Sequence, residues 1–296
     1  MGVIYMKILN FGSLNIDYVY SVDHFVQKGE TISSSQMNIF SGGKGLNQST
    51  ALGRAGAQVF HAGRIGKGGE FLVEQLKEAG VNTDLVVLDS QCSTGHAIIQ
   101  NDAEGDNCIL LYGGANQRIT KEQIDATLDQ FDAGDYLVLQ NETSNLPYLM
   151  EKAAEKQMKI VLNPSPMDEK IKALPLDKVT LFFVNEIEAA QILGQKELES
   201  TQEAAAAFRS MFPQAAVVLT LGSQGSVYID KDQVIPQKCY KVKSSRYHSC
   251  RRYFYWFLRI RHQQGQKPKR GTGPGIKSVC NCSVKTRGST ICTDFR

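Results

Sequence analysis

Apolar and polar positions follow two periods along the first 243 residues. Runs of consecutive apolar residues, typical of strands buried on both faces, occur at residues 7–11, 136–140, 159–162, 181–184 and 216–220. Between them, apolar residues recur every three to four positions, which predicts amphipathic helices, most clearly at residues 46–55, 70–79, 121–131 and 201–212. Alternating strands and helices indicate a mainly parallel sheet covered by helices, an α/β fold.

Two segments, residues 18–39 and 93–112, break this rhythm. In the second segment, the polar stretch NDAEGD (residues 101–106) separates AIIQ from CILLY. A glycine-containing turn between two β-prone runs predicts a hairpin. We expect both segments to form a small sheet that projects from the main one.

The pattern stops at residue 243. Residues 244–296 hold twelve lysines and arginines against one acid, Asp294, a net charge of +11, so the chain's total of +3 leaves −8 for residues 1–243. The same segment has the only tryptophan and four of the seven cysteines, and it shows no helical or alternating period. It could be a basic arm that binds nucleic acid, a small metal site, or a sequence translated in the wrong reading frame.

The length of 296 residues and the 42% hydrophobic content suit one large α/β domain with a small appendage. The N-terminal MGVIYMKILNFG lacks the features of a signal peptide, and no apolar run approaches a membrane span. We therefore expect a cytoplasmic protein without a membrane partner. Cys92, Cys108 and Cys239 are isolated in the sequence, which predicts buried, reduced thiols rather than a disulfide framework.

Candidate binding residues follow the first predicted strand. Asn15 and Asp17, in GSLNID, lie at its carboxyl end, where open α/β sheets bind ligands. They could bind neighbouring sugar hydroxyls, although a turn or a helix cap would use the same residue types. Residues 41–48, SGGKGLNQ, would bring the backbone and a helix N-terminus close to a ligand. A simple glycine-rich turn is the alternative, and the spacing is neither that of a phosphate loop nor that of a dinucleotide-binding motif.

Two further motifs, NEIE (residues 185–188) and TLGSQG (residues 220–225), each follow a predicted strand. In order and spacing, the four motifs resemble the ribokinase family of carbohydrate kinases, also called PfkB-type, over residues 6–243. GGKGLNQ, STG (93–95) and GGAN (113–116) are most similar to its ribokinase branch. The resemblance implies a three-layer Rossmann-like fold with a small β lid that closes over the sugar and forms a homodimer contact. It also implies phosphorylation of D-ribose by ATP, giving D-ribose 5-phosphate and ADP.

The resemblance assigns roles to single residues. The sugar-binding positions are Asn15, Asp17, Gly43, Lys44, Asn47 and Glu142. Asn185 and Glu188 match a motif that organises Mg²⁺ and phosphate, with Glu188 at the metal. The nucleotide loop corresponds to Thr220, Gly222 and Gly225. Without the resemblance, Glu188 could be an exposed helix acid and TLGSQG a hairpin entrance.

Codon arithmetic supplies a motif that the family requires and this chain lacks. Residues 244–257 can be encoded by a nucleotide sequence that reads AVDTTAAGDTFIG once its first base is dropped. Residues 276–294 can read SKASAIAVSKPGAAQSAPT in the same shifted frame. Both strings resemble the C-terminal part of the family. Because the second base of each codon is nearly fixed, we interpret residues 244–296 as a frameshifted tail.

The restored string contains the family's Gly-Asp pair. Its carboxylate would take the proton from the sugar hydroxyl, and its backbone amides would hold the developing negative charge. Arg251 and Arg252 occupy these two positions, and an arginine stays protonated and cannot act as a base. The family's K⁺ site and adenine contacts would lie in the same lost segment. We therefore expect the chain as written to contain no catalytic residue and to be impaired.

Two other roles for the tail are less well supported. A non-catalytic sugar-binding protein could bind nucleic acid through its basic tail, but no nucleic-acid-binding fold accompanies the charge. A zinc site could use His248 or His262 with Cys250, Cys280, Cys282 and Cys292, but the paired CxxC spacing of structural zinc sites is absent. We expect a sugar substrate, ATP with Mg²⁺, and neither nucleic acid nor zinc.

Overall fold

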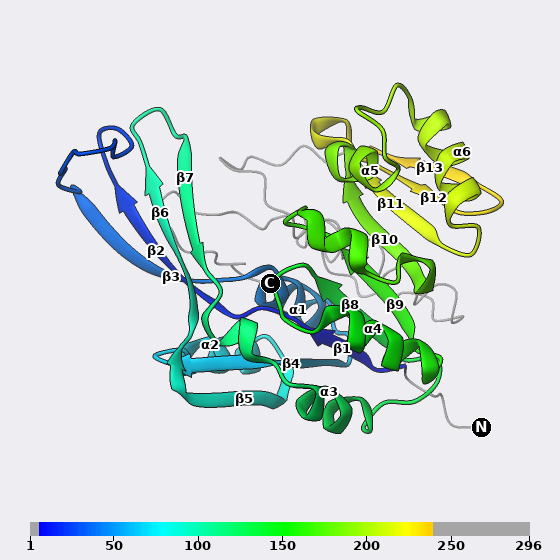
Figure 1. Ribbon diagram of the computed structural model, residues 1–296, viewed down its shortest axis with the longest axis horizontal. Helices are drawn as coiled ribbons and strands as arrows, with labels where there is room; N and C mark the ends of the chain where they lie inside the picture. Colours follow the sequence, from blue (N-terminus) through cyan, green and yellow to red (C-terminus); the bar gives the residue numbers. More distant parts are fainter. Residues whose placement is uncertain (1–5, 239–296) are drawn as a thin grey trace, which may run out of the picture.

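A nine-stranded sheet forms the centre of the molecule, in the order β13-β12-β11-β10-β9-β8-β1-β4-β5 (Figure 1). The computed structural model describes residues 6–238. The seven strands β5, β4, β1, β8, β9, β10 and β11 pair in parallel. At the β11 end, β12 pairs antiparallel with β11, and β13 pairs antiparallel with β12. The strands are β1 (Ile8–Phe11), β4 (Val59–Lys67), β5 (Asn82–Ser93), β8 (Tyr136–Gln140), β9 (Lys159–Asn163), β10 (Val179–Asn185), β11 (Ala216–Thr220), β12 (Ser226–Ile229) and β13 (Val234–Gln237).

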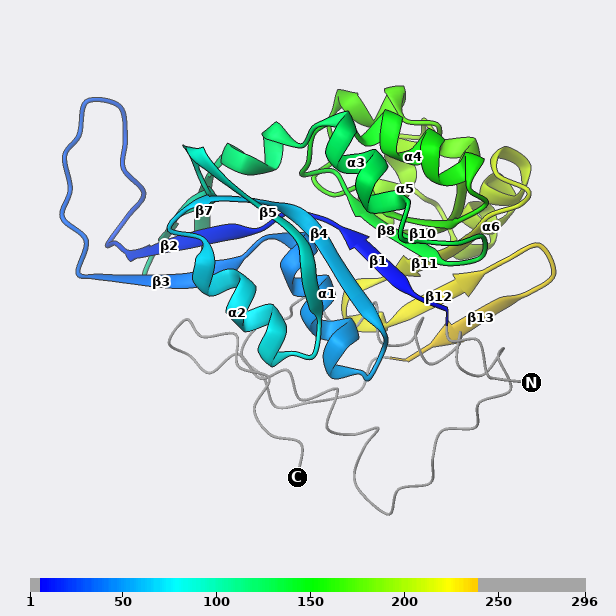
Figure 2. The ribbon, with the colours of Figure 1, turned by 90° about the horizontal axis from the view of Figure 1, so that it is seen from below.

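Helices cover both faces of this sheet (Figure 2). One face carries α1 (Lys44–Arg54) and α2 (Glu70–Glu78), and the other carries α3 (Lys121–Leu128), α4 (Leu146–Glu155), α5 (Glu186–Ile192) and α6 (Thr201–Met211). Short 3-10 helices are η1 (Gly114–Arg118), η2 (Glu169–Ala173), η3 (Leu176–Lys178) and η4 (Gly222–Gln224). The expected three-layer α/β fold is confirmed.

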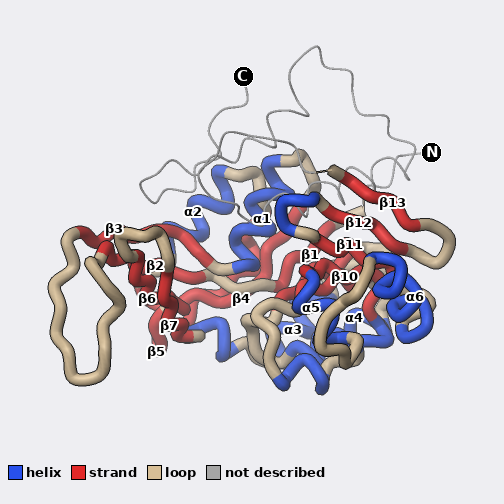
Figure 3. Tube along the Cα trace, turned by 90° about the horizontal axis from the view of Figure 1, so that it is seen from above, coloured by secondary structure: helices blue, strands red, loops and turns tan. Residues whose placement is uncertain are grey.

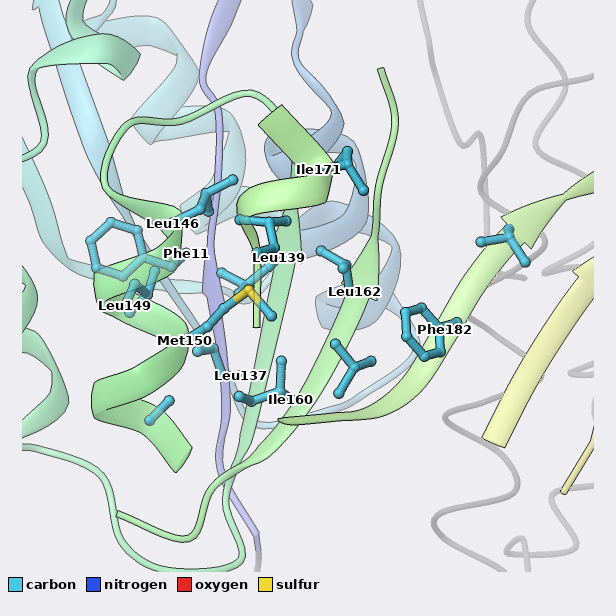
Figure 4. Close-up of a cluster of buried hydrophobic side chains, with 14 of the residues drawn as sticks. Phe11, Leu137, Leu139, Leu146, Leu149, Met150, Ile160, Leu162, Ile171 and Phe182 are labelled. Carbon is cyan, nitrogen blue, oxygen red and sulfur yellow. The ribbon is translucent and has the colours of Figure 1, made fainter. Parts of the chain in front are cut away.

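Each central strand contributes to two separate cores. Leu137 and Leu139 of β8 pack with Leu149 and Met150 of α4, as Figure 4 shows. Val138, between them, faces the opposite cluster under α1 and α2. Because both faces are buried, these strands do not alternate between apolar and polar residues. They appear in the sequence as continuous apolar runs.

A second, four-stranded sheet has the order β3-β2-β6-β7 and projects from the main sheet (Figures 1 and 3). Its strands are β2 (Asn15–Ser21), β3 (Gln36–Gly42), β6 (Gly95–Asn101) and β7 (Asn107–Tyr112). The predicted hairpin is confirmed, with Asn101 opposite Asn107. The small sheet is wider than the predicted residues 18–39, because β2 pairs with β3 and β6 along its whole length from Asn15.

Some sequence-based expectations need correction. Strands β4, β5, β12 and β13 were not predicted, and α1 begins at Lys44, two residues before the predicted start. The isolated cysteines are free, but Cys92 is only half-buried and Cys108 is exposed, so the expectation of burial was wrong for both. Cys239, the proposed frameshift junction and the suggested zinc ligands lie outside the described residues. Within residues 6–238, no helix has the length and apolar character needed to cross a membrane.

Candidate active site

The predicted sugar-binding residues meet at the carboxyl end of β1. From β1 the chain continues to β4 and β5 on one side, and it later returns to β8 on the other side of β1. Ligands of open α/β sheets bind at such a reversal of strand order. Residues after β1, residues after β8 and the first turn of α1 lie together there.

Glu142 links these three segments. Its carboxylate accepts hydrogen bonds from Ser13 Oγ, from the backbone N–H of Lys44 at 2.9 Å and from Lys44 Nζ at 2.8 Å. The Glu142 side chain is only 6% exposed. Ser13 Oγ also accepts from the N–H of Gly45 at 3.1 Å. An anion is favoured at a helix N-terminus, so Glu142 fixes the start of α1 against β1 and β8.

The Asp17 side chain points into the same region and makes no hydrogen bond within residues 6–238. A Cβ on Gly42 would lie 2.2 Å from both of its carboxylate oxygens, so only glycine leaves room for them. Burial, with a smaller contribution from the Glu142 carboxylate, raises the pKa of Asp17 to about 6, against the opposing effect of Lys44. Asp17 can therefore accept hydrogen bonds from a ligand, and its ionisation depends on pH near neutrality.

Asn15 and Asn47 border this region from β2 and from α1. Asn15 is 4% exposed, and its Oδ1 accepts a hydrogen bond from Asn116 Nδ2 at 2.7 Å. The side chain of Asn47 is half-buried and makes no hydrogen bond within residues 6–238. Gly43 precedes α1 with φ +93°, and a Cβ there would lie 2.9 Å from the carbonyl oxygen of Ser13. The turn and helix-cap alternatives for Asn15 and Asp17 were wrong, because both residues belong to strand β2.

Three residues of this site had no predicted role. Ser13 donates to Glu142, and Asn116 donates to Asn15. Gln117 Nε2 donates to the carbonyl oxygen of Glu142 at 2.8 Å. Asn116 lies in the GGAN motif that marked the resemblance, but local sequence gives no sign of its partner 101 residues away.

The predicted nucleotide residues lie at the ends of β10 and β11. Asn185 caps α5: its Oδ1 accepts from the N–H of Glu188 at 2.8 Å, and Glu188 Oε2 accepts from the N–H of Asn185 at 2.9 Å. Glu188 is 7% exposed, so the alternative of an exposed helix acid was wrong. Asn185 pairs with Thr220, whose Oγ1 donates to the carbonyl oxygen of Val184 at 3.3 Å.

The TLGSQG segment connects β11 to the antiparallel β12, so it is the entrance of a hairpin. Gly222 and Gly225 have φ values of +53° and +111°, conformations that favour glycine. The N–H of Leu221 donates to the carbonyl oxygen of Gly225 at 2.9 Å and closes the turn. A Cβ on Gly222 would meet no atom within 4 Å.

Both sets of residues lie at the carboxyl ends of the parallel strands. Between β1 and β10 there are three strand-to-strand steps, a separation of roughly 14 Å at the usual strand spacing. Within residues 6–238 no group of three His, Cys, Asp or Glu side chains could hold a metal ion. Glu188 offers one carboxylate in the first turn of α5.

A model of the pfkB family of carbohydrate kinases matches residues 6–245. This chain belongs to the pfkB carbohydrate kinase family. It is 33% identical to the ribokinase of Staphylococcus aureus (strain COL) over 249 residues, 80% of each chain. It is 26% identical to the deoxyribokinase of Salmonella typhi over 245 residues, which cover 81% of this chain and 80% of the relative.

Solved structures agree. The ribokinase of Cryptococcus neoformans var. grubii in complex with ADP has a TM-score of 0.72 at 28% identity, covering 93% of this chain and 91% of that one. The Arabidopsis thaliana ribokinase complexed with ribose and ATP has a TM-score of 0.76, covering 97% and 95%. At 20% identity, this second likeness concerns the fold alone. The expected family, fold and enzyme class, a carbohydrate kinase, are confirmed.

Proposed function

We propose that the gene encodes a ribokinase, which transfers the γ-phosphoryl group of ATP to the primary hydroxyl of D-ribose. The products are D-ribose 5-phosphate and ADP. The chain as written is impaired, because Arg251 and Arg252 replace the Gly-Asp pair of the family. Assembly as a homodimer through the small sheet and a cytoplasmic location stay predictions.

The observation that carries this proposal is the position of Asp17. Its carboxylate is held beside Glu142 and Lys44 with no hydrogen-bond partner within residues 6–238. A sugar offers several hydroxyl groups on neighbouring carbons, each able to donate one hydrogen bond and accept others. Such a ligand would supply hydrogen-bond partners for the Asp17 carboxylate, for the Asn15 amide and for the unpaired Asn47 amide.

The nucleotide would bind along the same edge, with its phosphates near Asn185 and the turn from Thr220 to Gly225. Glu188 would hold Mg²⁺, directly or through water. The ion would neutralise negative charge on the phosphates when it is bound. Glu188 Oε1 is available for this role, because the capping contact uses Oε2. The family's K⁺ site falls in the segment after residue 243.

The impairment is supported by the position at which the family match ends. The match stops at residue 245, two residues after the end of the regular apolar pattern. Loss of a general base typically lowers the rate by about 10²- to 10⁴-fold, and loss of an anion hole by about 10²- to 10³-fold. The two effects act on one step and are not multiplied.

The test compares the chain as written with the product of a gene from which one base near codon 244 is removed. ADP release is measured with ribose, Mg²⁺ and K⁺, and 2-deoxyribose is the second substrate because a deoxyribokinase is among the relatives. We expect turnover of ribose only by the repaired chain. Robust turnover by the chain as written would contradict the frameshift interpretation.

Binding measurements distinguish a ribokinase from the alternative, a non-catalytic sugar-binding protein. All predicted sugar-binding residues precede the junction, so the chain as written should bind ribose weakly in calorimetry and lose most affinity for ATP. A repaired chain that folds and binds ribose without turnover would favour the non-catalytic sugar-binding protein. Metal analysis of the chain as written should find no stoichiometric zinc.

A further inference from the structure

We propose that Asn116 is a positioning residue that fixes the orientation of the Asn15 side-chain amide, so that Asn15 presents its NH₂ group to the sugar. The inference rests on the proposed function, because it assumes that Asn15 lines the sugar site. It assigns opposite hydrogen-bonding roles to Asn15 and Asp17.

The orientation of Asn116 follows from the backbone of Leu14. The N–H of Leu14 can only donate, and it donates to Asn116 Oδ1 at 3.0 Å. The carbonyl oxygen of Leu14 can only accept, and it accepts from Asn116 Nδ2 at 3.3 Å. Turning the Asn116 amide by half a turn would place donor against donor and acceptor against acceptor. The identity of each atom is therefore determined by the backbone.

Asn116 in turn determines Asn15. Asn116 Nδ2 also donates to Asn15 Oδ1, at 2.7 Å, so Asn15 must direct its oxygen toward Asn116. The Nδ2 atom of Asn15 then carries two N–H donors, and no acceptor for them occurs within residues 6–238. Asp17 is two residues along β2 and on the same face, and it can only accept while ionised. The pair would donate to one hydroxyl oxygen and accept from a hydroxyl of the same ligand.

The two amides are buried and closely packed. Asn15 is 4% exposed and Asn116 is 1% exposed. Gly95 lies opposite Asn15, and a Cβ there would be 2.2 Å from Asn116 Nδ2 and 2.5 Å from Asn15 Oδ1. The backbone of Asn116 is held as well, since its carbonyl oxygen accepts from the N–H of Ser144 at 3.1 Å. The glycine provides the space in which the two amides meet.

The variant Asn116→Asp tests this directly, because aspartate has nearly the same shape. A carboxylate still accepts from the N–H of Leu14, but it cannot donate to Asn15 Oδ1. The Asn15 amide should then turn its NH₂ group toward the new carboxylate and its oxygen toward the sugar. Ribose would meet two acceptors side by side. We expect its Kd to rise by about tenfold or more.

The matched control is Asn145→Asp, the same chemical change elsewhere in the same region. Asn145 Nδ2 donates to the carbonyl oxygen of Ile119 at 2.7 Å, and within residues 6–238 its side chain makes no hydrogen bond to a proposed sugar-binding residue. Its positive φ of 58° is tolerated by aspartate as well as by asparagine. We expect the ribose Kd to change less than about twofold, although stability falls as it does in Asn116→Asp.

A double-mutant cycle with Asn15→Leu decides whether Asn116 acts through Asn15. Ribose Kd values are measured by calorimetry on the full chain in all four combinations. In the Asn15→Leu background, Asn116→Asp should add less than about twofold. The same large loss in both backgrounds, or no loss in the single variant, would overturn the inference.

A ligand-free measurement keeps this inference separate from the proposed function. In the NMR spectrum of the free protein, the NH₂ protons of Asn116 should exchange slowly and those of Asn15 quickly. In Asn116→Asp, the Asn15 protons should become protected. If the free protein shows this exchange and the parent binds no ribose, the proposed function fails while the amide orientation stands. Protected Asn15 protons in the parent would overturn the inference.

Discussion

The proposed sugar-binding half of the candidate site, around Glu142, and its proposed nucleotide half, around Asn185 and Glu188, are held together in different ways. In the sugar half, Glu142 binds Lys44, 98 residues away, and Ser13, 129 residues away. In the nucleotide half, Asn185 and Glu188 bind each other across three residues, and the turn at Gly225 closes across four. The first half depends on long-range contacts, whereas the cap and the turn of the second half are local motifs on two paired strands.

This difference determines how each half should respond to change. A long-range contact in a buried site joins elements that are far apart in the sequence, so its loss affects both geometry and stability. A local cap or turn forms from its own few residues and stabilises little beyond them. The same chemical substitution should therefore have unequal effects in the two halves.

The largest effect should come from Glu142→Gln. The amide would turn an NH₂ group toward Ser13 or Lys44, both of which donate to the native carboxylate. We expect the free energy of unfolding to fall by about 2–3 kcal/mol, because hydrogen bonds to a buried charge are lost. Circular dichroism during denaturant unfolding measures the change.

The control for this variant is Glu155→Gln, which breaks an exposed ion pair with Lys152. Its cost should be under about 0.5 kcal/mol, since exposed ion pairs contribute little. Equal losses in the two variants would show that Glu142 is not a structural link between β8 and α1.

A smaller effect concerns the pH dependence of ribose binding through Asp17. Its pKa of about 6 in the folded chain means that the carboxylate is largely protonated at pH 5. A protonated group accepts poorly, so the ribose Kd should be about tenfold higher at pH 5 than at pH 7. Asp17→Asn should bind weakly at both pH values. A flat profile in the parent would contradict the assignment of Asp17 as the acceptor.

The free energy of unfolding should depend on pH in the opposite direction to ribose binding. The folded chain takes up the proton on Asp17 below about pH 6, whereas the usual value of 3.8 applies when the chain is unfolded. Ionised Asp17 therefore destabilises the fold above pH 6, and the penalty is relieved as the pH falls from 6 toward 3.8. Comparing the parent with Asp17→Asn at several pH values isolates this contribution from Glu142 and Lys44.

The smallest effect should come from Glu188→Gln, the same exchange as at Glu142. A glutamine can still accept from the N–H of Asn185, so the free energy of unfolding should change by less than about 0.5 kcal/mol. Glu188→Ala removes the contact and should cost about 1 kcal/mol. In the repaired chain, Glu188→Gln should nevertheless raise the Mg²⁺ concentration needed for turnover. A stability loss as large as that of Glu142→Gln would remove the contrast between the two halves.

The same contrast explains what the sequence could predict. The cap at Asn185 and Glu188 and the turn around Gly222 depend on neighbouring residues, so their motifs were visible. The roles of Asn116 and Gly42 depend on partners brought together only by the fold. Strand β4 was missed because polar His61 and two glycines interrupt its apolar pattern. His61 is fully buried against Ser49, and burial lowers its pKa to about 4.

The order of strands also bears on when each half can form during folding. Ile8 of β1 pairs with Tyr136 of β8, 128 residues later, whereas Leu181 of β10 pairs with Ala216 of β11 only 35 residues later. Closing the longer loop costs about 1 kcal/mol more conformational entropy. Strands β8 to β13 can join one after another along a growing edge. The sugar-binding half has to wait for β8, however early β1 and β4 are made.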